Sequence, residues 1–210
     1  MPERTDRMAA EKLKSLNLQN QALDIIFREA RTHRAWQQRE VPDALIDQIY
    51  ELLKFGPTSA NCCPARFVFV KSKDAKERLR PHLDEGNKEK TMTAPVTAII
   101  AYDLKFYEQM PKLAPHMKDG KAMFTSKPEK IRDTAFLNGS LQGAYLIIAA
   151  RALGLDCGPM SGFDADGIKK EFFADNDYVP NFLCNIGYGD ESKLHPRSPR
   201  LTFDETSKII

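Results

Sequence analysis

The stretch that follows the first apolar segment of the chain is rich in groups that bind phosphate. It consists of Arg31, Thr32, His33 and Arg34. A guanidinium group can bind two phosphate oxygens at once, and a neighbouring hydroxyl adds a further donor. The alternative is an ordinary solvent-exposed helix end, where the helix dipole favours Arg and His in any case. Taken alone, this stretch indicates a phosphate site without establishing one.

A second polar stretch lies between a predicted helix and a predicted strand. It consists of Pro57, Thr58, Ser59, Ala60, Asn61, Cys62, Cys63 and Pro64. An amide such as that of Asn61 can both donate to and accept from the edge of a heterocycle. The ordinary interpretation is a turn in which Ser and Asn bond to their own backbone. Thiol catalysis is not expected, because it needs a nearby base or cation, and adjacent cysteines point in different directions.

The third candidate is divided between two segments that are far apart in the chain. The first is a predicted loop, Gly158 to Asp164, which includes Pro159, Met160, Ser161 and Gly162. The second is a basic tail segment in which Arg197 and Arg200 alternate with prolines that favour an extended chain. A disordered basic tail is the alternative for this second segment. No single stretch decides whether all of them converge on one site.

Composition restricts the kinds of partner that the protein can have. The 210 residues carry 31 Lys and Arg against 29 Asp and Glu, a net charge of +2, so no global field draws the chain onto nucleic acid or a membrane surface. Hydrophobic residues at 42% and charged residues at 29% are typical of a packed globular protein. Four cysteines are too few for a disulfide scaffold, and there is no signal peptide or apolar span, so a cytoplasmic protein is expected.

The elements that would position these stretches follow from hydrophobic periodicity and from Pro and Gly. Helices are expected at about 20–30, 42–53, 73–83, 129–153 and 165–173, and strands at 66–71, 96–102 and 182–188. The helix at 129–153 is apolar or small on nearly all sides, which places it in the core or at a subunit interface. Residues 104–130 contain three prolines and no sustained period, as is typical of a mobile lid.

Three or four short strands separated by long helices indicate an α+β sandwich. The length suits one domain. We expect a flexible N-terminal arm at residues 1–19, a single domain at 20–201 and a C-terminal tail at 202–210.

Three strings of residues, in this order, resemble the nitroreductase family of flavoproteins. They are Glu29-Ala30-Arg31-Thr32-His33, Gly56-Pro57-Thr58-Ser59-Ala60-Asn61 with Pro64-Ala65-Arg66-Phe67, and Gly158-Pro159-Met160-Ser161-Gly162-Phe163-Asp164. The resemblance spans roughly Ala22 to Leu201. It is strongest to the branch described as malonic semialdehyde reductase, or NADH dehydrogenase and nitroreductase, which is linked to pyrimidine degradation.

The resemblance implies a three-layer sandwich with a mostly antiparallel central sheet, assembled as an intertwined homodimer with FMN at the subunit interface. In this resemblance the FMN phosphate is held by Arg31, Thr32 and either His33 or Arg34, together with Arg197 and Arg200. The flavin ring is contacted by Pro57, Thr58, Ser59 and Asn61. Flavin N5 is approached by Pro159, Met160, Ser161 and Gly162. Ser161 stands where several members of the family have a carboxylate.

The activity implied is hydride transfer from NADH or NADPH through FMN to a small electrophile, in a ping-pong order. The substrate classes are an aldehyde such as malonic semialdehyde, a nitroaromatic or a quinone. No metal is implied and no catalytic nucleophile is assigned; Tyr102, Tyr107, His116 or water could supply a proton. The competing hypothesis is a dimer that binds or stores flavin without turnover.

Overall fold

One antiparallel sheet organises the fold in the computed structural model, which describes residues 18–210. Its strands are β1 (Ala65–Val70), β2 (Val96–Asp103), β3 (Asp156–Met160) and β4 (Tyr178–Gly187). They lie in the order β1-β2-β4-β3, and every neighbouring pair is antiparallel. The expected N-terminal arm, residues 1–19, falls outside the described residues except for its last two positions.

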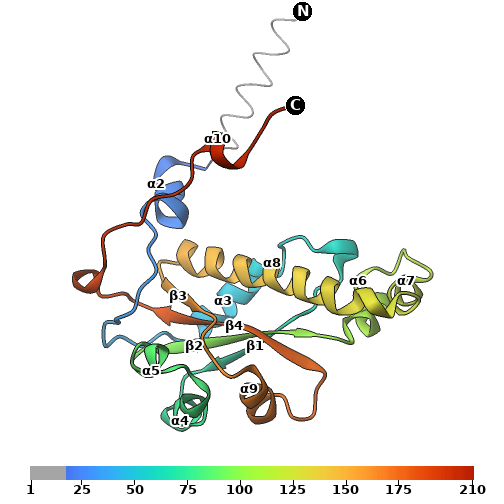
Figure 1. Cartoon of the computed structure of the whole chain (residues 1–210), viewed down its shortest axis with the longest axis horizontal. Coiled ribbons are helices and arrows are strands. Elements are labelled where there is room, and N and C mark those ends of the chain that lie inside the picture. The colour runs from blue at the N-terminus through green and yellow to red at the C-terminus, as the bar shows by residue number, and fades with distance from the viewer. Residues whose placement is uncertain (1–17) are drawn as a thin grey trace, which may run out of the picture.

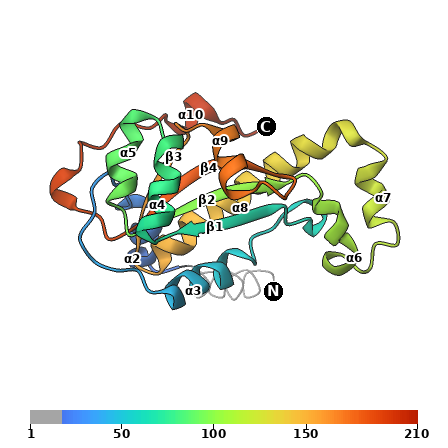
Figure 2. The same cartoon turned by 90° about the horizontal axis from the view of Figure 1, so that it is seen from below.

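Helices cover both faces of the sheet, which makes three layers (Figure 1). On one face lie α3 (Asp43–Leu53) and α8 (Ile131–Ala152). On the other face lie α4 (Lys73–Leu79), α5 (Glu85–Met92) and α9 (Ala165–Phe172), which are nearest the viewer in Figure 2. The expected α+β three-layer sandwich is therefore confirmed. None of the described helices is long and apolar enough to cross a bilayer.

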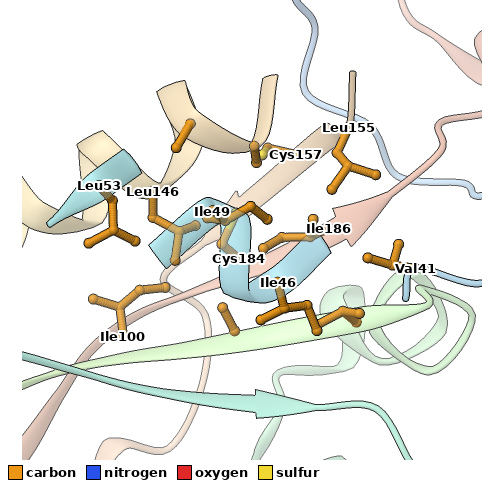
Figure 3. Close-up of a cluster of buried hydrophobic side chains, with 14 residues drawn as sticks. Val41, Ile46, Ile49, Leu53, Ile100, Leu146, Leu155, Cys157, Cys184 and Ile186 are labelled. Atoms are coloured by element: carbon orange, nitrogen blue, oxygen red, sulfur yellow. The ribbon is translucent and has the colours of Figure 1, made fainter. Parts of the chain in front are cut away.

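The larger part of the core fills the space between the sheet and α3 with α8 (Figure 3). Helix α3 begins after Pro42, and its apolar positions recur at helical spacing, so Ile46, Ile49 and Leu53 all face inward. They meet Leu146 of α8 and the side chains of β2 and β4 that point to this face. Because β2 has helices on both faces and strands on both sides, it is buried along its whole length.

Small residues allow α8 to lie close to the sheet. A Cβ on Gly143 would be 2.5 Å from the ring of Phe182, so a larger residue there would require this ring to move. Gly154 follows two residues after the end of the helix, and its φ of +77° is the left-handed conformation that favours glycine. The outer face of α8 stays apolar and exposed, with Phe136 and Leu137 both more than half exposed. The inner face of α8 therefore lies in the core, as expected for this helix, whereas no other part of the described chain covers its outer face.

The remaining helices are short. They are α2 (Asn20–Leu23), α6 (Met110–Leu113), α7 (Gly120–Thr125) and α10 (Phe203–Thr206), with a π-helical turn at Asp24–Arg28 after α2. Helices α6 and α7 lie in the expected lid, and α10 lies in the expected C-terminal tail.

The secondary structure predicted from sequence was wrong in three places. The first three residues of the predicted loop from Gly158 to Asp164 belong to strand β3, and Pro159 is tolerated there because β3 is an edge strand. Strand β4 begins at Tyr178 and not at Phe182. Helix α5 was not predicted, because only Asn87 and Thr91 of its polar sequence face the interior and no apolar period marks it.

Candidate functional site

Arg31, Thr32 and Arg34 line a hollow of about 450 Å³ together with Arg197 and Arg200 from the tail. We call it the basic hollow. Its lining also includes three basic side chains that the sequence did not single out, namely Arg151, Lys193 and His195. None of the residues that line it is acidic. This concentration of guanidinium groups without a counter-charge suits a phosphate group.

Contacts between distant parts of the chain hold the basic hollow together. The Arg31 guanidinium donates to the carbonyl of His195 at 2.5 Å, and Arg197 donates to the carbonyl of Ala30 at 3.1 Å. The Arg34 guanidinium lies 3.4 Å from the ring Nε2 of His195. The two segments are more than 160 positions apart in sequence. They are therefore brought together by tertiary structure alone.

Arg151, in the last turn of α8, also lines the basic hollow. One of its terminal nitrogens donates to the carbonyl of Ile26 at 3.2 Å, while its buried Nε has no partner in the described part of the chain. A basic residue in a last helical turn is favoured by the dipole without any ligand, so its sequence position carried no signal. Lys90 is also close to this region, since burial and then the charge of Arg34 lower the pKa of its amine.

His33 does not line the basic hollow. Its ring is buried, with Nε2 3.3 Å from the Asp156 carboxylate, and Gly189 packs so closely that a Cβ there would lie 1.9 Å from Nδ1. Burial would raise the pKa of Asp156, but hydrogen bonds from His33 and from the Gly189 N–H outweigh burial and lower it. Of the two candidates for the second phosphate contact, it is Arg34 that faces the hollow.

The segment Pro159 to Gly162 lies next to the Arg31–Arg34 stretch. Thr32 bridges to Cys157, the His33 N–H donates to the Cys157 carbonyl at 3.1 Å, and a Cβ on Gly158 would be 2.6 Å from the His33 carbonyl oxygen. Pro159 and Ser161 are exposed, and Met160 is buried. Two of the three predicted stretches are therefore neighbours within one chain.

The stretch from Pro57 to Asn61 is a tightly held loop. The Ser59 N–H donates to the Asn138 side chain of α8 at 2.8 Å, and the Asn61 amide donates to the Leu113 carbonyl at 2.7 Å. Positive φ angles at Ala60, Asn61 and Cys63, between 38° and 55°, give it a strained backbone. Such strain persists only where surrounding contacts impose it, and it is often found at functional sites.

The thiols of this loop do not form a nucleophilic site. Burial, and then the neighbouring Cys63, raise the pKa of Cys62 to about 11. A thiol with that pKa is protonated at neutral pH and is a poor nucleophile.

This loop is remote from the basic hollow within a single chain. Asn61 and Cys63 line a separate hollow of about 720 Å³, which has no lining residue in common with the basic hollow. Along α8, Asn138 contacts the loop and Arg151 lines the basic hollow, a separation of roughly 20 Å at 1.5 Å per residue. One chain thus brings together two of the three predicted stretches and leaves the third apart.

The three residues considered as proton donors lie elsewhere. Tyr102 is buried on β2 against Phe136, and Tyr107 packs against Phe106 in the segment predicted to be a lid. His116 is exposed. None of the three lines either hollow.

Residues 27–188 match the model of the nitroreductase family. A protein of Ralstonia nicotianae named "putative NADH dehydrogenase/NAD(P)H nitroreductase" is 54% identical over 193 residues, covering 92% of this chain and 98% of its own length. A protein of Polynucleobacter asymbioticus with the same name is 58% identical over 193 residues, with the same coverage.

Solved structures show the same fold at lower identity. A nitroreductase-like protein from Bacillus subtilis superimposes with a TM-score of 0.81 at 21% identity, covering 88% of this chain and 97% of its own. A second, from Exiguobacterium sibiricum and described as a complex with FMN, has a TM-score of 0.80 at 21% identity, covering 92% and 99%.

Proposed function

Because the chain belongs to the nitroreductase family, we propose that it is an FMN-dependent NAD(P)H oxidoreductase that functions as a homodimer. The names of relatives more than 50% identical to it support the reductant, and the FMN complex of a protein with the same fold supports the cofactor. The observation that carries the proposal is the basic hollow, in which five arginines and one lysine gather without a carboxylate. A cytoplasmic location stays a prediction.

The residues present fit the phosphate end of FMN. Arg31, Arg34 and Arg197 can donate to phosphate oxygens, and the buried Nε of Arg151 still lacks an acceptor in the described residues. A dianionic phosphate would supply acceptors and offset the mutual repulsion of these cations. The remaining predicted cofactor residues, from Pro57 to Asn61 and from Pro159 to Gly162, are proposed to contact the ring and ribityl parts.

Two features of the single chain support the proposed homodimer. The first is the exposed apolar surface of the helical face, where Phe55 is 80%, Leu137 58% and Phe136 51% exposed. Such a surface is typical of a protein interface. The second is the separation of the Pro57–Asn61 loop from the basic hollow. We propose that each site joins the basic hollow of one copy to this loop of the other.

Bound FMN would supply the hydride-transfer chemistry between NAD(P)H and the substrate. Arg31, Arg34 and Arg197 would hold its phosphate. Asn87 fixes the backbone of the Pro159–Gly162 segment by donating to the Gly162 carbonyl at 2.6 Å. Helices α6 and α7 lie at one end of the molecule (Figure 2), and Lys112 and Leu113 of α6 line the hollow that contains Asn61. These two helices are proposed to act as a lid over that hollow. One pocket shared by reductant and acceptor gives ping-pong kinetics, with an aldehyde such as malonic semialdehyde, a nitroaromatic or a quinone as acceptor.

The purified protein, reconstituted with FMN, tests this proposal directly. We expect NADH or NADPH to bleach the oxidised-flavin absorbance anaerobically, and an aldehyde, nitroaromatic or quinone to restore it in stopped-flow mixing. Bleaching that none of these acceptors reverses would indicate a flavin-storage dimer. Protein that does not retain FMN would refute the cofactor assignment.

The dimer has its own test in sedimentation of a variant with two charges on α8, Phe136→Glu with Leu137→Glu. We expect a folded monomer that binds FMN weakly, because the second half of each site is then missing. The exposed Lys130→Glu, just before α8, is the matched control and should remain dimeric. A double variant that sediments as a dimer would rule out this interface.

A further inference from the structure

Beneath the Pro159–Gly162 segment, on the face of the sheet that α4 and α5 cover, lies a buried lysine. The side chain of Lys76 is on the inner face of α4 and the residue is only 4% exposed. Its amine donates to the carbonyl of Thr91 on α5 at 2.8 Å and to the hydroxyl of Thr97 on β2 at 2.5 Å. It therefore joins a helix end to the centre of the sheet.

A continuous chain of hydrogen bonds runs from this amine to β3. The Thr97 hydroxyl donates to the Asn185 amide oxygen at 2.6 Å, and the Asn185 amide nitrogen lies 3.3 Å from the Thr91 hydroxyl. The Thr91 hydroxyl in turn donates to the sulfur of Met160 at 3.5 Å. Each hydroxyl has one hydrogen, so the chain has one direction, with the amine at its start and Met160 at its end.

The protonation state of Lys76 sets how many N–H groups its side chain offers to this chain of hydrogen bonds. A neutral amine has two N–H groups, which match the two acceptors, whereas an ammonium has three. The groups that the amine binds, and the amide that joins them, are uncharged: Thr91 from α5, Thr97 from β2 and Asn185 from β4. Helix α9 also packs against α4; its charged residues are Asp166, Lys169, Lys170 and Glu171, of which Glu171 pairs with Arg78. The charged residues of α5, Glu85, Lys88, Glu89 and Lys90, are not buried, and none forms an ion pair with Lys76. Burial lowers the pKa of Lys76 to about 7.

Helix α5 connects the same lysine to the segment a second time. Lys76 binds the carbonyl of Thr91 near the C-terminal end of α5. Near the N-terminal end, the Asn87 side chain and the Asp84 N–H both donate to the Gly162 carbonyl, at 2.6 Å and 3.2 Å. The position of α5 therefore affects Gly162, and the hydrogen-bond chain affects Met160.

We propose that Lys76 is a positioning residue for the Pro159–Gly162 segment, and that uptake of a proton from solvent by its amine shifts Met160 and strengthens FMN binding. The added positive charge under the segment favours an anionic ligand. Only the part concerning FMN rests on the proposed function. The coupling of Lys76 to Met160 is a property of the cofactor-free protein.

The first test follows Met160 in protein without FMN. The seven methionines are labelled with ¹³C at the methyl group, and the Met160 signal is assigned from its loss in Met160→Leu. We expect this signal to shift with a midpoint near the pKa of Lys76, about 7, and to remain constant in Lys76→Met. A signal that does not respond to pH, or responds equally in Lys76→Met, overturns the proposal.

Two further variants keep this test decisive. Lys73→Met changes an exposed lysine on the same helix, and in this variant the Met160 signal should shift with pH as it does in the wild type. Thr97→Val keeps the amine but removes the hydroxyl that passes its effect to Asn185, so it should suppress the shift of Met160. If Lys76→Met fails to fold, Thr97→Val decides, and an unchanged titration in that variant contradicts the hydrogen-bond chain.

The second test measures FMN affinity by fluorescence at about pH 6 and about pH 8.5, on either side of the titration. The FMN phosphate also titrates, but it does so equally in both proteins, so the comparison with Lys76→Met removes its contribution. Between the higher and the lower pH, the FMN affinity of the wild type should increase about threefold more than that of Lys76→Met. Equal pH dependence in the two proteins overturns the FMN part. Failure of both to bind FMN would refute the proposed function, and the Met160 measurement would still decide the coupling.

Discussion

Two regions of the molecule hold cations without an acidic partner, and they do so in different ways. In the basic hollow, guanidinium groups gather at the surface and keep their charge, because Arg does not lose its proton in proteins and water solvates the groups. Beneath α5, the amine of Lys76 is buried among uncharged groups, and burial lowers its pKa to about 7. The arginines of the hollow therefore keep a positive charge that can bind an anionic ligand, whereas the charge of the buried Lys76 amine depends on pH.

The largest effect should come from removing charge from the hollow. We expect Arg31→Ala combined with Arg197→Ala to weaken FMN binding by about 4 kcal/mol, roughly a thousandfold, since each charge-assisted bond contributes about 1.5–3 kcal/mol. Equilibrium titration with FMN measures the loss. Arg80→Ala, an exposed arginine outside the hollow, is the control and should bind normally. Equal losses in both proteins would mean that the hollow does not hold the phosphate.

The next effect concerns stability and belongs to Lys76. Its folded pKa lies below the unfolded value of 10.5, so the unfolded chain binds more protons between about pH 7 and 10.5. The stability penalty is complete below pH 7 and is relieved as pH rises, so the unfolding free energy should increase by about 2–4 kcal/mol across this window. Denaturant titrations of the wild type and Lys76→Met measure it. A parallel pH profile in Lys76→Met would contradict the assignment.

A smaller effect separates the two regions by ionic strength. Salt screens charges that are exposed to water and hardly affects buried ones. Raising the salt to about 0.5 M should therefore weaken FMN binding roughly three- to tenfold and leave the pH dependence of stability unchanged. The same titrations at two salt concentrations provide the measurement. FMN binding that is insensitive to salt would show that the phosphate is held by something other than surface cations.

The smallest effect on the cofactor should come from Cys62. Its thiol is fully buried, and replacing it by Ala leaves a small cavity that costs about 1 kcal/mol of stability. FMN affinity should stay within about twofold of the wild type, because the thiol is protonated and buried. A loss of FMN comparable to that of the double arginine variant would bring the thiol back into the site.

Much of the fold could be predicted because its signals are local. Pro42 and the spacing of Ile46, Ile49 and Leu53 marked α3, and the small residues of α8 with Gly154 at its end marked that helix. Helix α5 and strand β3 were missed because their identity depends on what they pack against. Thr91 and Asn87 face inward because they form hydrogen bonds with Lys76 and Gly162 there. Pro159 is compatible with a strand because β3 lies at the edge of the sheet.

The site was predicted in its parts, and its assembly was not. Residue types alone indicated that Arg31, Arg34 and Arg197 suit a phosphate, because a guanidinium has that chemistry wherever it stands. The direction of each side chain was set by the fold: His33 turned inward to Asp156, and Arg151 joined the hollow from a helix end. Sequence determines which groups are available and which local elements form. Tertiary structure decided which arginines line one hollow and that the Lys76 amine is buried away from water, because both depend on contacts between residues far apart in the chain.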